Sequence, residues 1–195
     1  MRTKIFFLSL VLIGLLIVTG CAKPEAAPTP TAAKEAETAE TKVSGYMTAK
    51  QALAVAQKAV PSDAYPYIIK ERSAVLWSAK FDGTSNNWTI VFYAPSQDKR
   101  YEIDVIGGEV KSTFEGAAPS SPPNKLPDGW MDSSEVANLP EVKSRCSGTP
   151  EGSYFFGIYA TYTAEEKATW QVGCGESGSQ ITIEVDAVTG EYLGP

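Results

Sequence analysis

The sequence predicts an α+β fold made of two tandem modules, each with one helix packed on a three-stranded antiparallel sheet. Two observations lead to this prediction. The same order of one amphipathic helix and three strands with alternating apolar residues occurs twice along the chain. Matching residues also lie at a nearly constant separation: Leu53 and Val136 are 83 positions apart, and Trp88 and Trp170 are 82 apart. A constant offset with the same element order indicates an internal duplication.

The first module is expected over residues 44–116 and begins with a helix. Thr48 and Gln51 have the spacing of a capping box, in which both side chains bond to free backbone N–H groups at the helix start. Pro61 ends this helix. Three strands follow, and the last is interrupted by two glycines and can resume at Val110. Their alternating apolar residues span positions 75–81, 88–93 and 101–105.

The second module is expected over residues 128–195 and repeats this order. Asp132 and Glu135 have the same capping spacing, and Pro140 should kink or shorten the helix that follows. Alternating apolar residues then predict three strands at positions 154–162, 170–174 and 181–185.

A proline-rich segment, residues 117–127, separates the two modules. Four of its eleven residues are proline, which excludes a regular helix or a central strand. Modules of about 70 residues are marginally stable alone. We therefore expect the segment to be a linker and the two modules to pack together.

The N-terminus has the features of a lipoprotein signal peptide, residues 1–20. Arg2 and Lys4 precede an apolar run over residues 5–18, which is shorter than the roughly 20 residues of a membrane span. The following sequence, Val-Thr-Gly-Cys, resembles the bacterial lipobox, and Cys21 is the residue that would accept the lipid, with acyl chains such as palmitate. The alternative is a transmembrane anchor with an incidental cysteine.

A disordered tether is expected over residues 21–43. The stretch after Cys21 is rich in Ala, Thr, Pro and Glu and contains no aromatic residue, so it cannot offset its chain entropy by burying apolar surface. The expected location is the extracytoplasmic side of a cell membrane or outer membrane, with the lipid as the membrane contact. Ala22 favours the outer membrane by resemblance to Gram-negative lipoproteins, whereas a Gram-positive cell has only one membrane to hold it.

The charge of the chain excludes nucleic acid as a partner. Removal of residues 1–20 leaves 15 basic and 23 acidic side chains, a balance of −8, and no basic cluster is present to neutralise phosphates. The charges are spread over the folded part, which is typical of a solvated acidic surface.

Cys146 and Cys174 are left as a pair once Cys21 carries the lipid. In an oxidising compartment such a pair predicts a disulfide, here between the second helix and the middle strand of the second module. Two free buried thiols are the first alternative. A metal site is the second, although the chain has no histidine to complete a zinc ligand set.

The C-terminal strands carry a family resemblance. An alternating strand, the turn sequence Asp186-x-x-Thr189-Gly190 and a resumed strand together resemble the end of a PepSY domain. The resemblance extends to the opening helix and later strands of the first module, and it covers most of residues 46–111 and 132–193. PepSY-like domains are extracytoplasmic, pack a helix on an antiparallel sheet, and occur in peptidase propeptides and envelope proteins. The resemblance implies binding, with inhibition or chaperoning of a peptidase as one form of it, and supplies no catalytic residues.

Two positions are candidates for ligand contacts. Alternation places Phe155 and Tyr159 on the face of their strand opposite to the core, where they either line a ligand groove or pack between the modules. The Asp186 turn could hold a cation, but a calcium loop needs more oxygen ligands, so a simple turn is favoured.

No catalytic arrangement is apparent, and we expect no enzyme activity, cofactor or metal. A serine nucleophile needs a neighbouring base, and without histidine only a Ser–Lys arrangement would remain. Paired carboxylates are present on two strands, Glu102 with Asp104 and Glu184 with Asp186, and we expect them on the solvent face of their strands. The sequence therefore predicts a non-catalytic, protein-binding lipoprotein of the envelope, with a small-ligand or cell-wall-binding lipoprotein as the alternative.

Overall fold

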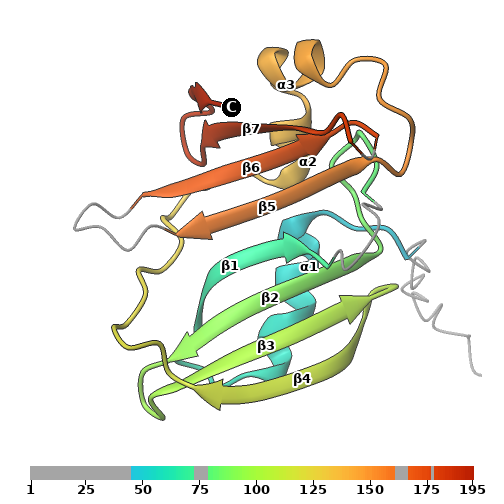
Figure 1. Ribbon diagram of the computed structural model, residues 1–195. Helices are drawn as coiled ribbons and strands as arrows, with labels where there is room; N and C mark the ends of the chain where they lie inside the picture. The colour runs from blue at the N-terminus through green and yellow to red at the C-terminus, as the bar shows by residue number, and fades with distance from the viewer. Residues whose placement is uncertain (1–44, 73–78, 161–166, 177) are drawn as a thin grey trace, which may run out of the picture. The chain divides into compact units, whose positions relative to one another are not determined.

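The computed structural model describes residues 45–72, 79–160, 167–176 and 178–195 (Figure 1). The signal peptide, Cys21 and the tether lie outside these residues, as do positions 75–78 of the first expected strand and Tyr162. Of that expected strand, residues 79–81 are described: Ala79 forms an isolated bridge to Tyr154, and the two residues after it belong to no strand.

One antiparallel sheet of eight strands dominates the fold, in the order β4-β3-β2-β1-β5-β6-β7-β8. The α+β class is thus confirmed, but the expected pair of three-stranded sheets is replaced by a single continuous one. We call β1–β4 the N-terminal half of the sheet and β5–β8 the C-terminal half. The strands are β1 (Tyr65–Glu71), β2 (Asn87–Ala94), β3 (Lys99–Ile106), β4 (Glu109–Ala117), β5 (Tyr154–Ala160), β6 (Ala168–Cys174), β7 (Ile181–Asp186) and β8 (Tyr192–Gly194).

Strand β1 was missed by the sequence analysis, and it joins the two halves. It pairs with β2 on one side and with β5 on the other, where Ile69 lies opposite Ile158. Pro66 interrupts the apolar pattern at its start, and the register with β2 shifts between Pro66 and Ile68. A proline beside a bulge is the expected way for a strand to tolerate the missing N–H group.

The helices begin where the capping pattern predicts. Helix α1 (Ala49–Ala56) has a complete capping box with Thr48 and Gln51 and continues into a 3-10 turn, η1 (Gln57–Ala59). Helix α2 (Ser133–Ala137) has the corresponding box with Asp132 and Glu135. Pro140 breaks the second helix as expected, because it occupies the first position of a separate helix, α3 (Pro140–Arg145). No helix within the described ranges combines the length and apolar character needed to cross a bilayer.

The helices lie on one face of the sheet and enclose the core with it (Figure 1). The start of α1 is bonded to the start of α2: the amide of Ala49 donates to the buried Ser133 hydroxyl at 2.9 Å, and the amide of Lys50 donates to Asp132 Oδ1 at 3.0 Å. These bonds satisfy N–H groups that a helix start otherwise leaves free. The two halves are thus connected through their helices as well as through β1 and β5.

The proline-rich segment contributes to this packing. The carbonyl of Pro123 accepts a hydrogen bond from the Tyr65 hydroxyl at 2.8 Å. The amide of Leu126 donates to the carbonyl of Pro66 at 3.1 Å. The Leu126 side chain is buried in the core. The segment is therefore fixed along β1, which sequence composition alone did not indicate.

The predicted disulfide between Cys146 and Cys174 is present. Cys146 follows α3 and Cys174 ends β6, with a Cα–Cα distance of 5.6 Å, and both residues are buried. It joins the helices of the C-terminal half to β6, the middle of the three strands that the sequence predicts for the second module.

Candidate functional site

Phe155 and Tyr159 lie on the sheet face that the helices leave uncovered. Because Ile158 faces the core beside Ile69, strand alternation places Phe155, Gly157 and Tyr159 on the other side. Both aromatic side chains lean over Gly157: a Cβ atom there would lie 3.0 Å from Phe155 Cζ and 2.9 Å from Tyr159 Cε2. Glycine at this position allows the two rings to approach each other above the backbone.

The two rings border a cavity of about 220 Å³ at the junction of the two halves. Lys70 lies directly opposite Gly157 across the β1·β5 pair and opposite Thr89 across the β1·β2 pair. The structure thus brings the two candidate residues of β5 together with charged residues of the first half. The lining consists of Lys70, Glu71, Arg72, Thr89, Glu102, Phe155 and Tyr159.

Asp104 organises the charged side of this cavity. Its carboxylate accepts from the Thr89 hydroxyl at 2.7 Å and from the Ser112 hydroxyl, and it pairs with Arg72 at 3.1 Å. Asp104 lies on the sheet face away from the core, as expected, but its neighbours bury the side chain. The expectation that it is exposed to solvent is therefore wrong. A buried carboxylate with three partners is the normal way to keep such a charge in the fold.

The remaining charges around the cavity differ in their partners. Glu102 pairs with Arg100. The ammonium group of Lys70 forms no ion pair or hydrogen bond within the described part of the chain, and the same holds for the hydroxyl of Tyr159. Burial raises the pKa of Tyr159, so this phenol stays protonated and can donate. One cation and one hydroxyl of the described lining are therefore available to a ligand, beside the aromatic side chains of Phe155 and Tyr159.

The two edges of the sheet differ strongly. Strand β8 has three residues, whereas β4 has nine and is exposed along almost its whole length. Phe114 and Val110 on β4 are 58% and 37% exposed. Short edge strands resist pairing with other chains, and long ones invite it. Strand β4 is therefore the edge at which another strand can add.

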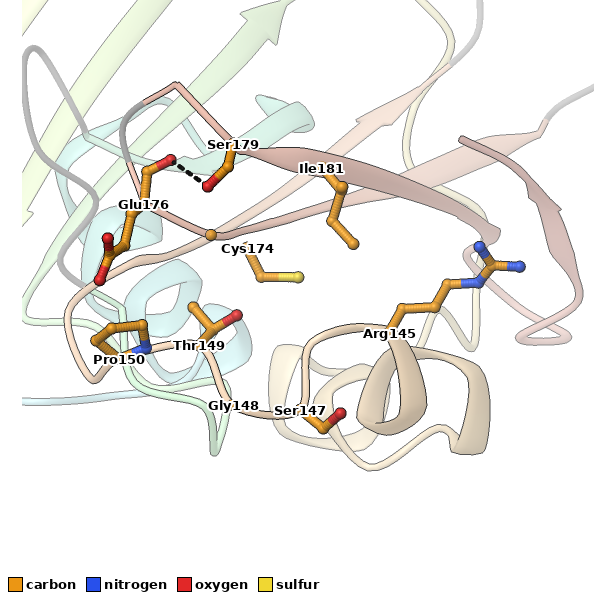
Figure 2. A pocket seen from close by; sticks show the side chains of 10 residues that line it. Arg145, Ser147, Gly148, Thr149, Pro150, Cys174, Glu176, Ser179 and Ile181 are labelled. Atoms are coloured by element: carbon orange, nitrogen blue, oxygen red, sulfur yellow. Dashed lines mark hydrogen bonds between the residues drawn. The ribbon is translucent and has the colours of Figure 1, made fainter.

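A second hollow, of about 340 Å³, lies beside the disulfide (Figure 2). Arg145, the cation in its described lining, pairs with Glu141 at 3.5 Å and lies 4.4 Å from the centre of the Tyr192 ring. The Ser179 hydroxyl donates to the Glu176 carbonyl at 3.4 Å. Unlike the cavity at Lys70, the hollow therefore offers a ligand no unpaired cation within the described residues.

This second hollow contains a glycine pattern that the sequence analysis overlooked. Residues 173–178 have the Gly-x-Gly-x-x-Gly spacing of a dinucleotide-binding loop. That motif works by leading into a helix whose N-terminus holds the pyrophosphate. Here β6 ends at Cys174 and the next element is the antiparallel strand β7. The pattern belongs to a strand connection, and no helix start faces the hollow.

A Ser-x-x-Lys spacing at Ser96 and Lys99 was also overlooked. The two residues lie at the β2–β3 turn, where the amide of Ser96 donates to Asp63 at 2.8 Å and Lys99 pairs with Glu115. The hydrogen bond that Lys99 donates to Glu115 raises the pKa of Lys99. A lysine that activates a serine needs a lowered pKa, so this pair is not arranged as a nucleophile and its base.

Asp186 forms the turn that the sequence favoured over a cation site. Its Oδ1 atom accepts from the amides of Val188 and Thr189, at 2.9 and 2.8 Å, and from the Thr189 hydroxyl at 3.1 Å. Gly190 follows with a φ of +71°, which glycine adopts without strain. The Oδ1 atom of Asp186 is thus used within the turn.

Comparison with known proteins shows the fold alone. No protein-family model and no curated protein match the chain. A solved structure described as "a putative lipoprotein (CD1622) from Clostridium difficile 630" is similar, with a TM-score of 0.55 and 11% sequence identity over 76% of this chain and 91% of that one. At this identity, the similarity establishes a shared α+β architecture.

Proposed function

We propose that this chain is a non-catalytic, lipid-anchored protein of the cell envelope that binds an extended segment of another envelope protein. Three features support the anchor: the basic and apolar start, the lipobox ending in Cys21, and the tether that follows. The protein of similar fold is itself described as a putative lipoprotein. Retention of Met1, or an unmodified Cys21 in protein purified from membranes, would contradict lipidation when measured by mass spectrometry.

We also propose that the fold arose from two tandem PepSY-like modules, residues 44–116 and 128–195. Trp88 and Trp170, 82 positions apart, each donate an indole hydrogen bond to the carbonyl of a methionine, at Met47 and Met131. Each half also has its capped helix on the same face of the sheet. Regulation of a peptidase is the form of binding that the PepSY resemblance implies.

The observation that carries the binding proposal is the exposed edge strand β4. An unpaired edge presents backbone N–H and C=O groups to which an extended peptide can bond as an added strand. Nine residues of β4 are available, and the strand lies at the end of the sheet away from the disulfide-bonded half. Backbone bonding of this kind recognises shape, so side chains must supply the selectivity.

Phe114 is the side chain best placed to select a partner. It is exposed on the face opposite the helices, and its ring lies over Gly116, where a Cβ atom would come within 2.9 Å of Cε1. The charged residues of β4 are already paired, Lys111 with Glu109 and Glu115 with Lys99. We expect the added strand to place an apolar residue against Phe114.

Photo-crosslinking in living cells tests this proposal. A photoreactive residue at position 113 on β4 should capture a defined envelope protein, and the same residue at position 193 on β8 should not. Phe114→Lys should reduce capture at position 113 by about tenfold or more, as for loss of an interface anchor. Leu193→Lys is the matched control, because it adds the same charge to a 53% exposed apolar residue on the other edge.

Two results would overturn the proposal. One is equal capture from both edges, which would indicate random contact in the envelope. The other is capture at position 113 that Phe114→Lys reduces no more than Leu193→Lys does.

A further inference from the structure

We propose that the cavity at the β1·β5 junction binds a single sugar-sized ring that carries a carboxylate. This site lies on the open face of the sheet and is separate from the β4 edge. Its residues come from both halves: Lys70, Arg72 and Thr89 from the first, and Phe155 and Tyr159 from the second. The site therefore exists only when the two halves form one sheet.

The aromatic pair provides the apolar part of the site. Phe155 and Tyr159 converge above Gly157, and neither side chain is fully buried. Ligand pockets typically combine aromatic walls with a few polar groups that fix orientation. A pyranose ring suits such walls, because its C–H groups can pack on aromatic carbon while its hydroxyl groups project towards polar neighbours.

Lys70 provides the charge that selects an acid. Arg72 is engaged by Asp104 at 3.1 Å, and Glu102 by Arg100, whereas Lys70 has no ion-pair partner within the described residues. It lies opposite Gly157, so its side chain leaves the sheet on the same face as the two rings. A carboxylate on the ligand would complete the pairing, and such charge-assisted bonds are the stronger ones.

The Tyr159 hydroxyl provides a second polar contact. It makes no hydrogen bond within the described part of the chain, and it lies 3.0 Å from the position that a Cβ atom of Gly157 would take. A hydroxyl of this kind can donate to a ring oxygen or accept from a sugar hydroxyl. The Tyr159 hydroxyl can therefore orient a ligand that Lys70 binds through its charge.

The volume limits the ligand to one ring. Pockets for drug-sized ligands typically measure about 300–1,000 Å³, and this cavity measures about 220 Å³. A dinucleotide or an oligosaccharide could place only one of its units here.

Titration of the full chain with glucuronate and with glucose tests the proposal. The two probes differ at one carbon, which carries a carboxylate in one and a hydroxyl in the other. We expect saturable binding of glucuronate by calorimetry and ligand-observed NMR, with glucose at least about tenfold weaker, since a charge-assisted hydrogen bond is lost.

Variants then locate the binding. Lys70→Gln should weaken glucuronate binding by about 10- to 100-fold and remove its preference over glucose. Gly157→Ala should weaken both sugars, because the methyl group displaces the two rings. Lys58→Gln, at an exposed lysine of η1, is the control for charge and should change nothing.

Three outcomes overturn the inference: no saturable glucuronate binding, equal binding of glucose, or a Lys70→Gln variant that binds like the wild type. Circular dichroism and thermal unfolding of each variant show whether a loss reflects the site or the fold. Phe114→Lys should leave sugar binding intact, so failure at the β4 edge is distinguishable from failure here.

Discussion

Trp88 and Trp170 make the same hydrogen bond in the two halves of the sheet. The Nε1 atom of each donates to a methionine carbonyl at 2.9 Å, that of Met47 for Trp88 and that of Met131 for Trp170. Both indoles are fully buried. Each bond fixes the segment before a helix to the middle of the sheet, so each tryptophan should contribute similarly to stability.

Replacing either tryptophan by phenylalanine tests this equivalence. Trp88→Phe and Trp170→Phe should each lower the free energy of unfolding by about 2–4 kcal/mol, since each removes an indole hydrogen bond and leaves a small cavity. Urea denaturation followed by circular dichroism gives the values. Trp130→Phe is the control: this ring packs at a tilt against Trp170, with ring centres 6.1 Å apart, but makes no indole hydrogen bond within the described residues. If Trp130→Phe lowers the free energy of unfolding as much as the other two substitutions do, the indole hydrogen bond does not have the role assigned to it.

Removing the disulfide should destabilise the protein markedly. The bond between Cys146 and Cys174 closes a loop with a sequence separation of 28. The double variant Cys146→Ala/Cys174→Ala should lose about 3–4 kcal/mol according to the chain-entropy model. Denaturation of the wild type with and without reductant supplies the control. Unchanged stability after confirmed reduction would show that the bond adds no constraint to the unfolded chain.

Two tyrosines of β5 should respond differently to loss of their hydroxyls. Tyr154 faces the core and donates to the Thr149 carbonyl at 2.7 Å, so Tyr154→Phe should cost about 1 kcal/mol. Tyr159 faces the open side without a hydroxyl partner in the described part of the chain, so Tyr159→Phe should change stability by less than about 0.5 kcal/mol. Thermal and urea unfolding measure both. A larger loss at Tyr159 would reveal a structural contact for that hydroxyl.

Acid should weaken the Asp186 turn. Burial alone would raise the pKa of Asp186, but hydrogen bonds from Thr189 and Val188 outweigh it and lower the pKa below its ordinary value. A lowered folded pKa means that the unfolded chain binds the proton more readily. The stabilisation is therefore complete above about pH 4 and is lost as the pH falls through the lower folded value.

The variant Asp186→Asn isolates this effect, because an asparagine oxygen can still accept the turn bonds but does not titrate. Its stability should fall less steeply than that of the wild type between pH 5 and pH 3, a window set by the ordinary aspartate pKa of about 3.9. Asp128→Asn, at an almost fully exposed aspartate, controls for the loss of one negative charge. If stability falls with pH in parallel for the wild type and Asp186→Asn, protonation of Asp186 is not linked to stability.

Local chemistry made much of this fold predictable. The capping boxes at Thr48 and Asp132, the break at Pro140 and the alternating strands around Trp88 and Trp170 all depend on residues close in sequence. Strand β4 was only hinted at by Val110, because an edge strand exposed on both faces has no apolar alternation to detect. The cysteine pair was predictable because the lipid expected at Cys21 leaves an even number of cysteines.

The arrangement of the site was not predictable from local patterns. Phe155 and Tyr159 could be assigned to an open face, but their neighbour Lys70 belongs to β1, whose pattern is disturbed by Pro66. The pairing of β1 with β5 joins residues far apart in sequence, and one sequence contains no direct signal for such a contact. The partners that bury Asp104 likewise come from three other segments.

The central position of β1 also has a consequence for biogenesis. In the finished sheet Ile69 lies opposite Ile158, a residue 89 positions later in the chain. A polypeptide that emerges from its amino end presents β1, with one side unpaired, well before β5 arrives. Over that interval the nascent chain has an open edge at β1 in addition to the one at β4. Helix α1 also lacks the hydrogen bonds that Asp132 and Ser133 accept from its first amides. Chains terminated before residue 154 would keep both edges open, making truncated products the species most prone to cross-pair and most in need of a chaperone.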